Sequence, residues 1–188
     1  MNKRIIIAIT GASGVVYGIR TLSMLRDMGA ETHLVISDAG RITIELETSH
    51  TVQEVESMAH RVHAVKDFTA PLASGSFLTD AMVVVPCTIK TLSAIANSYT
   101  DNLIARAADV HLKERRKLVL VVRETPLTGN HLNLMARAAQ MGALILPPMP
   151  AFYHRPATID DIISQTVGKI LDSLGLPHTL FKRWGETA

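Results

Sequence analysis

Five short, uninterrupted apolar runs constrain the fold of this chain more than any other feature. They are rich in isoleucine, leucine and valine and lie at residues 5–9, 33–36, 82–85, 118–122 and 143–146. Alternating apolar and polar residues are typical of a strand with one exposed face, whereas continuous β-branched runs are typical of strands buried on both faces. The pattern therefore predicts a parallel sheet covered by helices on both sides.

Helix-like spacing fills the intervals between these runs. Ile19, Leu22 and Leu25 lie three residues apart, and Gly29 follows where a helix often ends. Further helices are expected after a capping box that begins at Thr51, and over residues 101–114, 130–141 and 158–174. The alternation predicts one α/β domain over residues 1–188, a three-layer, doubly wound parallel sheet with right-handed crossovers.

The composition excludes several other classes of protein. With 19 Lys and Arg against 17 Asp and Glu, the formal charge of +2 gives no reason to expect nucleic-acid binding. A single cysteine, Cys87, excludes an internal disulfide framework. The first apolar run is too short for a signal peptide, and no run approaches the roughly 20 apolar residues that span a bilayer. We therefore expect a cytoplasmic protein with neither a nucleic acid nor a membrane as partner.

The residues after each strand are the first candidates for a site, because ligands of parallel α/β sheets bind beyond the carboxyl ends of the strands. After the first run comes Thr10-Gly11-Ala12-Ser13-Gly14, where small residues and backbone N–H groups can approach an anion. The spacing is neither G-x-G-x-x-G nor a Walker A loop, so a tight strand-to-helix turn stays open beside phosphate binding. Ser37 follows the second run, and Glu45 and Glu47 beyond it are expected on a solvated helix face.

Two further strand ends carry chemistry. The third run leads into Pro86-Cys87-Thr88-Ile89-Lys90-Thr91, where hydroxyls and a lysine at a helix start suit a phosphate or the edge of a flavin. No histidine stands next to Cys87 to activate it, so we expect a buried, inert thiol. The fourth run ends in Arg123-Glu124, which suit phosphate binding and proton transfer; a surface ion pair is the alternative.

The remaining polar and aromatic residues give weaker signals. Residues 147–156 contain four prolines and therefore predict a stiff loop, whose Phe-Tyr pair is placed for a ligand or a subunit contact. The histidines form no convincing metal site; His60 and His63 are the one close pair, and we expect them on the surface. Asp160-Asp161 lacks a third aspartate one turn on and fits a capped helix start. We therefore expect no metal.

Together these segments resemble the UbiX-type flavin prenyltransferases, a family found in ubiquinone biosynthesis and in phenolic-acid decarboxylation systems. The resemblance rests on Thr10-Gly11-Ala12-Ser13-Gly14, Glu45-Leu46-Glu47-Thr48, Ser74-Gly75-Ser76-Phe77, Pro86-Cys87-Thr88-Ile89-Lys90-Thr91, Arg106-Ala107-Ala108-Asp109-Val110 with Lys113-Glu114, Arg123-Glu124-Thr125-Pro126-Leu127, and Pro147-Pro148-Met149-Pro150-Ala151-Phe152-Tyr153. They stand in the family's order over nearly the whole chain. Each segment is weak alone, and seven in register are highly specific.

The resemblance implies a fold, a reaction and partners. The fold would be Rossmann-like or flavodoxin-like. The chain would be a metal-independent transferase that joins a dimethylallyl group from dimethylallyl phosphate to N5 and C6 of reduced FMN. The product, prenylated FMN, is the cofactor of UbiD-type decarboxylases. The family also implies a homododecamer with sites formed between subunits.

The resemblance likewise implies the residues of the site. The residues that hold FMN would be Gly11, Ala12, Ser13, Ser37, Thr88, Ile89, Lys90, Thr91 and Arg123. Those around the prenyl phosphate would be Ser13, Lys113, Arg123, Glu124, Tyr153 and Lys169, the last two from a neighbouring chain. Thr88 stands where serine is usual and keeps the hydroxyl. Lys169 stands where arginine is common and loses the bidentate geometry.

Roles follow from the chemistry of these side chains. The catalytic residues would be Ser13, Glu47, Lys113, Arg123, Glu124 and Tyr153. Lys113, Arg123 and Lys169, together with the hydroxyl of Tyr153, would stabilise the leaving phosphate. Glu47, Glu124 and Ser13 would serve proton transfer. Trp184 and Phe77 would shelter an allyl-cation-like transition state with their aromatic faces.

Two other functions stay open. FMN-dependent decarboxylases of the phosphopantothenoylcysteine type share the fold, but they have a Pro-Ala-Met-Asn stretch where this chain has Met149-Pro150-Ala151-Phe152-Tyr153. A non-catalytic FMN-binding subunit of a decarboxylase would need no second phosphate site. The sequence also leaves open a monophosphate or a diphosphate donor, and the missing metal ligands favour the monophosphate.

Overall fold

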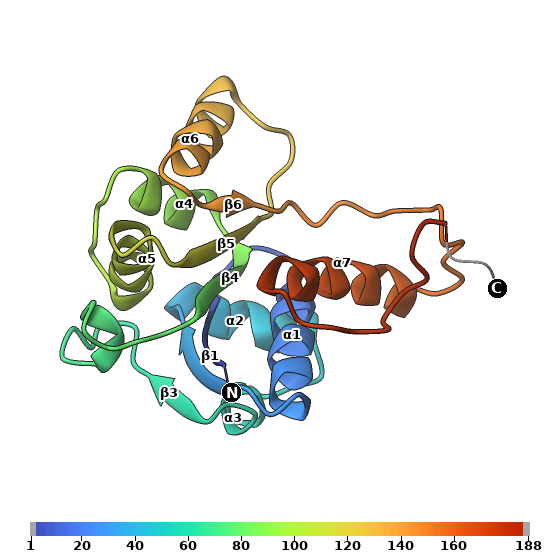
Figure 1. Cartoon of the computed structure of the whole chain (residues 1–188), viewed down its shortest axis with the longest axis horizontal. Helices are drawn as coiled ribbons and strands as arrows, with labels where there is room; N and C mark the ends of the chain where they lie inside the picture. Colours follow the sequence, from blue (N-terminus) through green and yellow to red (C-terminus); the bar gives the residue numbers. More distant parts are fainter. Residues whose placement is uncertain (1–2, 186–188) are drawn as a thin grey trace.

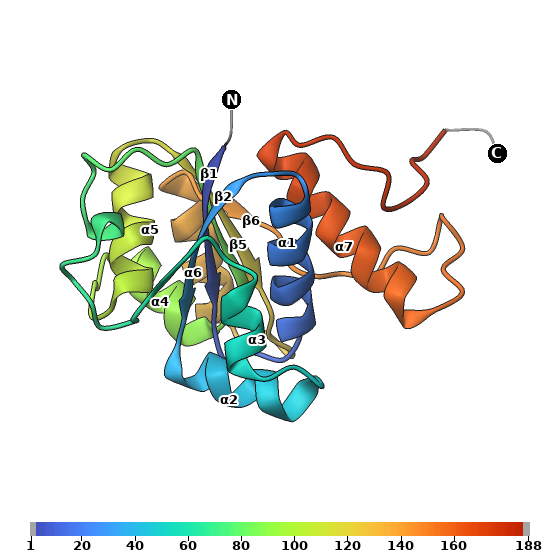
Figure 2. The ribbon, with the colours of Figure 1, turned by 90° about the horizontal axis from the view of Figure 1, so that it is seen from below.

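Six parallel strands form one sheet between two helical layers in the computed structural model, which describes residues 3–185 (Figures 1 and 2). The strands are β1 (Arg4–Ile9), β2 (Glu31–Ile36), β3 (Arg61–His63), β4 (Ala81–Cys87), β5 (Lys117–Val122) and β6 (Leu144–Ile145). The helices are α1 (Val15–Asp27), α2 (Asp38–Glu47), α3 (Val52–Ser57), α4 (Ile89–Ala96), α5 (Leu103–Lys113), α6 (Gly129–Gln140) and α7 (Ile159–Leu174), with a 3-10 turn at Pro71–Ala73.

The strand order is β3-β2-β1-β4-β5-β6, which confirms the predicted doubly wound sheet. This is the Rossmann order, and the five strands other than β3 have the flavodoxin order. In both descriptions the chain reverses direction across the sheet between β1 and β4. A crevice is expected at that switch point, outside the carboxyl ends of these two strands.

Strand β1 shows why the apolar runs are continuous. Ile5, Ile7 and Ile9 face a core formed with α1, α2, α3 and α7. Ile6 and Ala8 face a second core formed with α4, α5 and α6. Because successive side chains of a strand point to opposite faces, a sheet covered on both sides needs an apolar residue at every position. Figure 2 shows the two helical layers on either side of the strands.

The predicted helix ends are confirmed. Thr51 and Thr158 form capping boxes at the starts of α3 and α7, and Gly175 ends α7 in the left-handed conformation at φ 67°. Strand β3 was not predicted, because it is an edge strand of three residues in which Arg61 and Val62 are exposed. Such a segment lacks the continuous burial that identifies the inner strands.

Helix α7 and the segments on either side of it extend beyond the sheet. Figure 1 shows residues 147–158 leaving the sheet after β6, and the segment after α7 returning beside that helix. Within residues 3–185, no helix has the length and apolar character that a membrane crossing requires.

Candidate functional site

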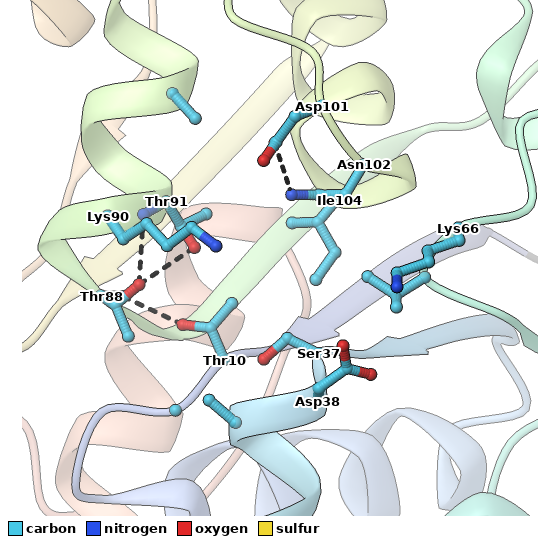
Figure 3. Close-up of a pocket in the computed structure, with 14 residues that line it drawn as sticks. Thr10, Ser37, Asp38, Lys66, Thr88, Lys90, Thr91, Asp101, Asn102 and Ile104 are labelled. Carbon is cyan, nitrogen blue, oxygen red and sulfur yellow. Dashed lines mark hydrogen bonds between the residues drawn. The ribbon is translucent and has the colours of Figure 1, made fainter.

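A cavity of about 260 Å³ lies at the switch point, beyond the carboxyl ends of β1 and β4 (Figure 3). Five separate segments contribute to it: the ends of β1 and β2, the loop after β3, and the starts of α4 and α5. The lining residues are Thr10, Gly11, Ser37, Asp38, Ala39, Val65, Lys66, Thr88, Lys90, Thr91, Ala94, Asp101, Asn102 and Ile104. Apart from α4 and α5, which follow one another along the chain, these segments are separated by other strands or helices, so the fold brings them together.

Three helix N-termini meet at this cavity. The side-chain oxygens of Ser37, Thr88 and Asn102 cap α2, α4 and α5 by accepting backbone N–H groups three residues further on, at 3.0, 3.1 and 3.0 Å. The remaining N–H groups of each first turn have no partner within their helix, and the helix dipoles place partial positive charge there. The arrangement therefore suits an anionic ligand such as a phosphate ester.

Thr10 fastens the two strands on either side of the switch point. Its hydroxyl donates to the backbone oxygen of Pro86 at 2.7 Å and accepts the N–H of Thr88 at 3.0 Å. The side chain is buried, with 1% of its surface exposed. Figure 3 shows the contact between Thr10 and Thr88 at the floor of the cavity. Sequence reasoning did not assign Thr10 to the site, although its position directly after the first strand was the available signal.

The loop after β1 lies close against the start of α2. A Cβ added at Gly11 would lie 2.4 Å from the Cβ of Ala39, so only glycine fits there. Gly14 begins α1 in the left-handed conformation at φ 96° and has no side-chain cap. Its N–H instead donates to the Glu47 carboxylate at 2.7 Å. Glu47 is exposed, as expected, and it is tied to the loop that carries Ser13.

Most of the residues expected to hold FMN lie at or beside the cavity. Gly11, Ser37, Thr88, Lys90 and Thr91 line it. Ala12 and Ser13 follow in the same loop, and Ile89 begins α4. The backbone N–H of Arg123 donates to the oxygen of Cys87 at 3.1 Å, which places Arg123 beside Thr88 at the next strand end.

Arg123 and Glu124 are both exposed at the carboxyl edge. Glu124 accepts the backbone N–H of Thr125 at 3.0 Å. In the part of the chain that the structure describes, neither side chain is in an ion pair, so the surface ion pair that we considered does not form there. Both groups are therefore available to a ligand.

The cavity is also lined by three charged residues and one amide that the sequence analysis did not assign to the site. Asp38, Lys66, Asp101 and Asn102 line it. Asp38, Asp101 and Asn102 lie at the capped starts of α2 and α5, and this position was a signal in the sequence that could have assigned them to the site. Lys66 lies in a loop with no motif, and only the fold brings it to this edge.

Five expected site residues lie elsewhere in the single chain; one of them, Trp184, meets Tyr153 edge to face in the extension beyond the sheet. Lys113 ends α5 at the opposite edge, next to Glu114 with which it pairs. Phe77 is at that edge too, with the Arg4 guanidinium 4.5 Å from its ring centre. Tyr153 and Lys169 belong to the extension formed by the proline-rich loop and α7. These residues can join the cavity only if another copy of the chain brings them there.

Cys87 matches the expectation of an inert thiol. It is fully buried at the end of β4, and desolvation raises the pKa of the thiol far above its usual value. A thiol that stays protonated is a poor nucleophile.

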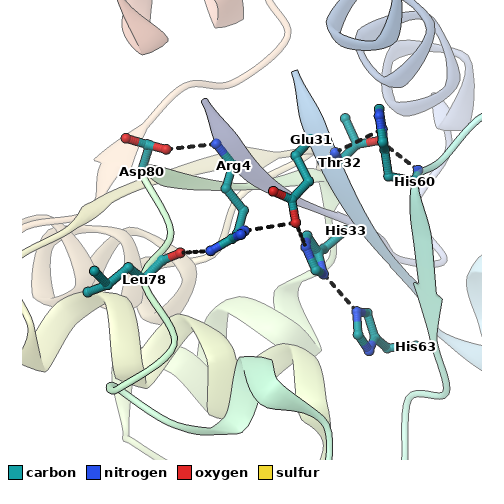
Figure 4. Close-up of polar contacts among 8 residues, drawn as sticks. All are labelled: Arg4, Glu31, Thr32, His33, His60, His63, Leu78 and Asp80. Atoms are coloured by element: carbon teal, nitrogen blue, oxygen red, sulfur yellow. Dashed lines mark hydrogen bonds and ion pairs between the residues drawn. The ribbon is translucent and has the colours of Figure 1, made fainter. Parts of the chain in front are cut away.

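A second polar cluster lies at the amino edge of the sheet (Figure 4). Glu31 contacts the Arg4 guanidinium at 2.9 Å and the Nε2 atom of His33 at 3.0 Å, and Nδ1 of His33 lies 2.9 Å from Nε2 of His63. Our expectation of a surface position is wrong for His63, which is 8% exposed. His33 on β2 is the polar partner of the buried His63, and the spacing of histidines in the sequence did not show this pair. Burial lowers the pKa of both histidines and so favours their neutral forms.

No three His, Cys, Asp or Glu side chains gather as a metal site within the described range 3–185. The polar groups at the cavity are hydroxyls, backbone N–H groups, two lysines and two carboxylates, which suit a phosphorylated organic ligand. The fold and the cavity together define a doubly wound α/β protein with a nucleotide-type site at the switch point.

Comparison with known proteins identifies the family. The model of the Flavoprotein family matches residues 1–171. The flavin prenyltransferase UbiX of Salmonella typhimurium is 56% identical over 185 residues, which cover 97% of this chain and 98% of the relative. The mitochondrial flavin prenyltransferase PAD1 of Saccharomyces cerevisiae is 49% identical over 182 residues, 97% of this chain and 75% of the relative. The chain belongs to the Flavoprotein family and, within it, to the UbiX-type flavin prenyltransferases.

Solved structures agree with this membership. The crystal structure of AnUbiX (PadA1) in complex with FMN and dimethylallyl pyrophosphate superimposes with a TM-score of 0.98 at 47% identity over the full length of both chains. A dodecameric FMN-dependent UbiX-like decarboxylase from Escherichia coli O157:H7 gives 0.95 at 47% identity, covering 97% of this chain and all of that one. The cypemycin decarboxylase CypD, at 14% identity and a TM-score of 0.65, shares the fold alone.

Proposed function

We propose that this chain joins the dimethylallyl group of dimethylallyl monophosphate to N5 and C6 of reduced FMN, forming prenylated FMN for a UbiD-type decarboxylase. The observation that carries the proposal is the meeting of three capped helix N-termini on one cavity, in a chain that matches UbiX enzymes over 97% of its length. The chain is a flavin prenyltransferase, and FMN is its flavin.

FMN binding is assigned to the cavity at the switch point. Hydroxyls and backbone N–H groups from Gly11, Ala12, Ser13, Ser37, Thr88, Ile89 and Thr91 would bind the flavin phosphate and the polar edge of the ring, with Lys90 and Arg123 adding positive charge. Ile104, Val65 and Ala94 provide apolar surface in the same cavity. The residues present therefore fit a flavin nucleotide, which combines an anionic end with a flat, largely apolar ring.

The prenyl donor is assigned to the neighbouring part of the carboxyl edge. Ser13 in the loop after β1 and Arg123-Glu124 after β5 are all exposed there. A guanidinium and a hydroxyl provide partners for a second phosphate ester, separate from that of the flavin. A protein that only stored FMN would not need this second set of groups.

The donor site is completed in our proposal by other copies of the chain. Lys113, Tyr153 and Lys169 lie away from the cavity in one chain. The cavity of about 260 Å³ is also slightly smaller than the roughly 300–1,000 Å³ of most small-molecule sites. We therefore infer a homododecamer, the state of the E. coli O157:H7 relative, in which subunit contacts bring these side chains to the donor.

The proposed chemistry divides between the flavin and the protein. When bound, the reduced flavin supplies N5 and C6 as the nucleophilic atoms. Arg123, Lys113 and Lys169, with the hydroxyl of Tyr153, stabilise the phosphate as the bond between the prenyl carbon and its oxygen breaks. Glu124, assisted by Ser13 and by Glu47 in the adjoining loop, transfers the protons that the two new bonds require.

The decisive experiment incubates the protein with reduced FMN and dimethylallyl monophosphate without oxygen, and measures the mass of the released flavin. We expect FMN that is heavier by one prenyl group, formed equally well with a chelator present. Parallel incubation with the diphosphate identifies the donor. Unmodified FMN with both donors would overturn the proposal. Carbon dioxide from a phosphopantothenoylcysteine substrate would instead support the decarboxylase reading.

The shared site has its own test, in which chains with Lys113→Ala and chains with Glu124→Gln are co-expressed. Each variant alone is expected to be impaired. If the two residues meet across a subunit contact, mixed assemblies contain some sites with both wild-type residues, and activity recovers in part. Recovery would be absent if Lys113 and Glu124 of one chain served the same site.

A further inference from the structure

The C-terminal segment 176–185 lies directly on α7. The chain turns at Gly175 and runs back beside the helix toward the proline-rich loop (Figure 1). Gly168 of α7 has no side chain, and a Cβ there would lie 2.5 Å from a ring atom of Phe181 and 2.6 Å from one of His178. Helix and segment therefore touch along the backbone of α7.

Asp172 holds this segment by three hydrogen bonds. The Arg183 guanidinium donates to both carboxylate oxygens, at 2.7 Å to Oδ1 and 3.1 Å to Oδ2. His178 lies with Nε2 3.1 Å from Oδ1, and its Nδ1 accepts the N–H of Leu180 at 3.2 Å. A ring nitrogen that accepts carries no proton in the neutral imidazole, so the proton of a neutral His178 is on Nε2, which donates to Asp172.

The contact is partly shielded from water and is charged. The side chain of His178 is 1% exposed and that of Asp172 is 25% exposed. The hydrogen bond from Arg183 lowers the pKa of Asp172 below its usual value, and the charge of Arg183 adds to this against the opposing effect of partial burial, so the carboxylate is ionised at neutral pH. Bidentate arginine–carboxylate pairs of this kind fix orientation as well as contributing energy.

The same helix also holds the loop that carries Tyr153. At its first turn, the carboxylate of Asp161 accepts the backbone N–H groups of Ala157 and Thr158, both at 2.9 Å. Helix α7 is thus a common support for two segments. The loop before α7 carries Tyr153, and the segment after α7 carries Trp184. The two rings meet edge to face, with their centres 5.7 Å apart and an angle of 81° between their planes.

The two segments enclose a hollow of about 300 Å³ between aromatic rings and cations. Its lining consists of Tyr153, His154, Arg155, Lys182, Arg183, Trp184 and Gly185. Aromatic faces attract an allylic chain and its developing positive charge, while the cations attract a phosphate. The exposed fraction of Trp184 is 82%, so its ring is presented outward and is not part of a core.

We propose that Asp172 is a positioning residue for the prenyl donor: by clamping the C-terminal segment to α7, it keeps Trp184 against Tyr153 as one aromatic wall for the allylic chain. The inference rests on the proposed function, since the donor is the ligand that the wall would serve. Asp172 acts through Arg183 and Trp184 and does not touch the reacting atoms. Its Oδ2 atom also lies 3.8 Å from Nζ of Lys169, which we assign to the donor phosphate, so the donor KM of Arg183→Leu, which leaves this pair intact, separates the clamp from an effect through Lys169.

The test is the Asp172→Asn variant, which keeps the shape of the side chain and removes its charge. Trp184 is the only tryptophan of the chain, so intrinsic fluorescence anisotropy reports the mobility of the segment alone. We expect lower anisotropy and a KM for dimethylallyl monophosphate raised by about tenfold, with the Kd for FMN unchanged, because a charged bidentate contact is lost. Asp172→Glu retains both oxygens and is expected to recover part of the loss.

Asp160→Asn is the matched control. It removes a carboxylate from the first turn of the same helix, at the end opposite to Asp172. Asp160 pairs with Arg20 and not with the C-terminal segment. This variant should leave the anisotropy and the donor KM at wild-type values. Arg183→Leu breaks the same contact from the segment side, so it tests the clamp even if Asp172→Asn fails to fold.

Two results would overturn the inference. Unchanged anisotropy in both Asp172→Asn and Arg183→Leu would show that the clamp does not hold the segment. Lower anisotropy with an unchanged donor KM would show that the segment is held but does not serve the donor. Failure of the proposed function can be told apart from failure of this inference. In that case the wild-type protein would form no prenylated FMN, while its anisotropy could still be compared with that of the variants.

Discussion

The carboxylate of Glu47 accepts a hydrogen bond from the backbone N–H of Gly14, with 2.7 Å between Oε2 and the nitrogen. The bond joins the end of α2 to the loop that begins α1, and it gives that helix start a cap that its own side chains lack. Glu47 therefore has a structural task in addition to the proton-transfer role that we propose for it.

Two substitutions separate the tasks of Glu47. Glu47→Gln keeps an oxygen acceptor for Gly14, so FMN affinity should stay near the wild-type value while the prenylation rate falls. Glu47→Ala removes the acceptor, and we expect FMN binding to weaken by about fivefold, corresponding to about 1 kcal/mol for one exposed hydrogen bond. Flavin titration and single-turnover rates measure the two effects. A wild-type rate in Glu47→Gln would exclude proton transfer by this residue.

Gly11→Ala should disrupt the flavin site through sterics. The new Cβ would lie 2.4 Å from the Cβ of Ala39 and 3.0 Å from its backbone carbon, so the loop or the start of α2 must move. Overpacking of this kind costs about 1–3 kcal/mol, and we expect FMN affinity to fall by at least about tenfold. Gly129→Ala is the control, because nothing lies within 4 Å of a Cβ there. Equal behaviour of the two variants would refute the steric argument.

Cys87 should resist alkylation in the folded protein. The thiol is fully buried, and burial raises its pKa, so the reactive thiolate is not populated at neutral or mildly alkaline pH. With iodoacetamide at pH 8, mass spectrometry should detect no adduct under native conditions and one adduct in urea. Rapid labelling of the native protein would contradict the burial of this side chain.

The cluster around Glu31 should make stability depend on acid pH. The contact with Arg4, followed by the hydrogen bond from His33, lowers the pKa of Glu31 from 4.5 to about 2. A depressed carboxyl pKa stabilises the folded state fully above the unfolded value of 4.5, and this contribution is lost as the pH falls toward 2.

Glu31→Gln tests this linkage by urea unfolding over a range of pH. The free energy of unfolding should be lower than that of the wild type at pH 7, and the difference between the two proteins should shrink steadily below pH 4.5. A difference that stayed constant down to pH 2.5 would show that the effect of the substitution comes from packing and not from charge.

The sequence determined the layers of this fold and the chemistry of its site segments. Continuous apolar runs such as residues 5–9 require cover on both faces, and capping boxes at Thr51 and Thr158 fix where helices begin. Because the carboxyl ends of parallel strands share one edge, the polar residues after the first and third runs could be expected to meet there. The motif set was also sufficient to indicate the family.

Only the tertiary structure decided which segments meet. Lys66 and Asn102 join the cavity, while Lys113 and Phe77 lie at the opposite edge, because these distances depend on strand order and helix length. No local pattern encodes such long-range neighbours. His63 is buried for the same reason, since its partner His33 lies on the adjacent strand, 30 residues earlier in the chain.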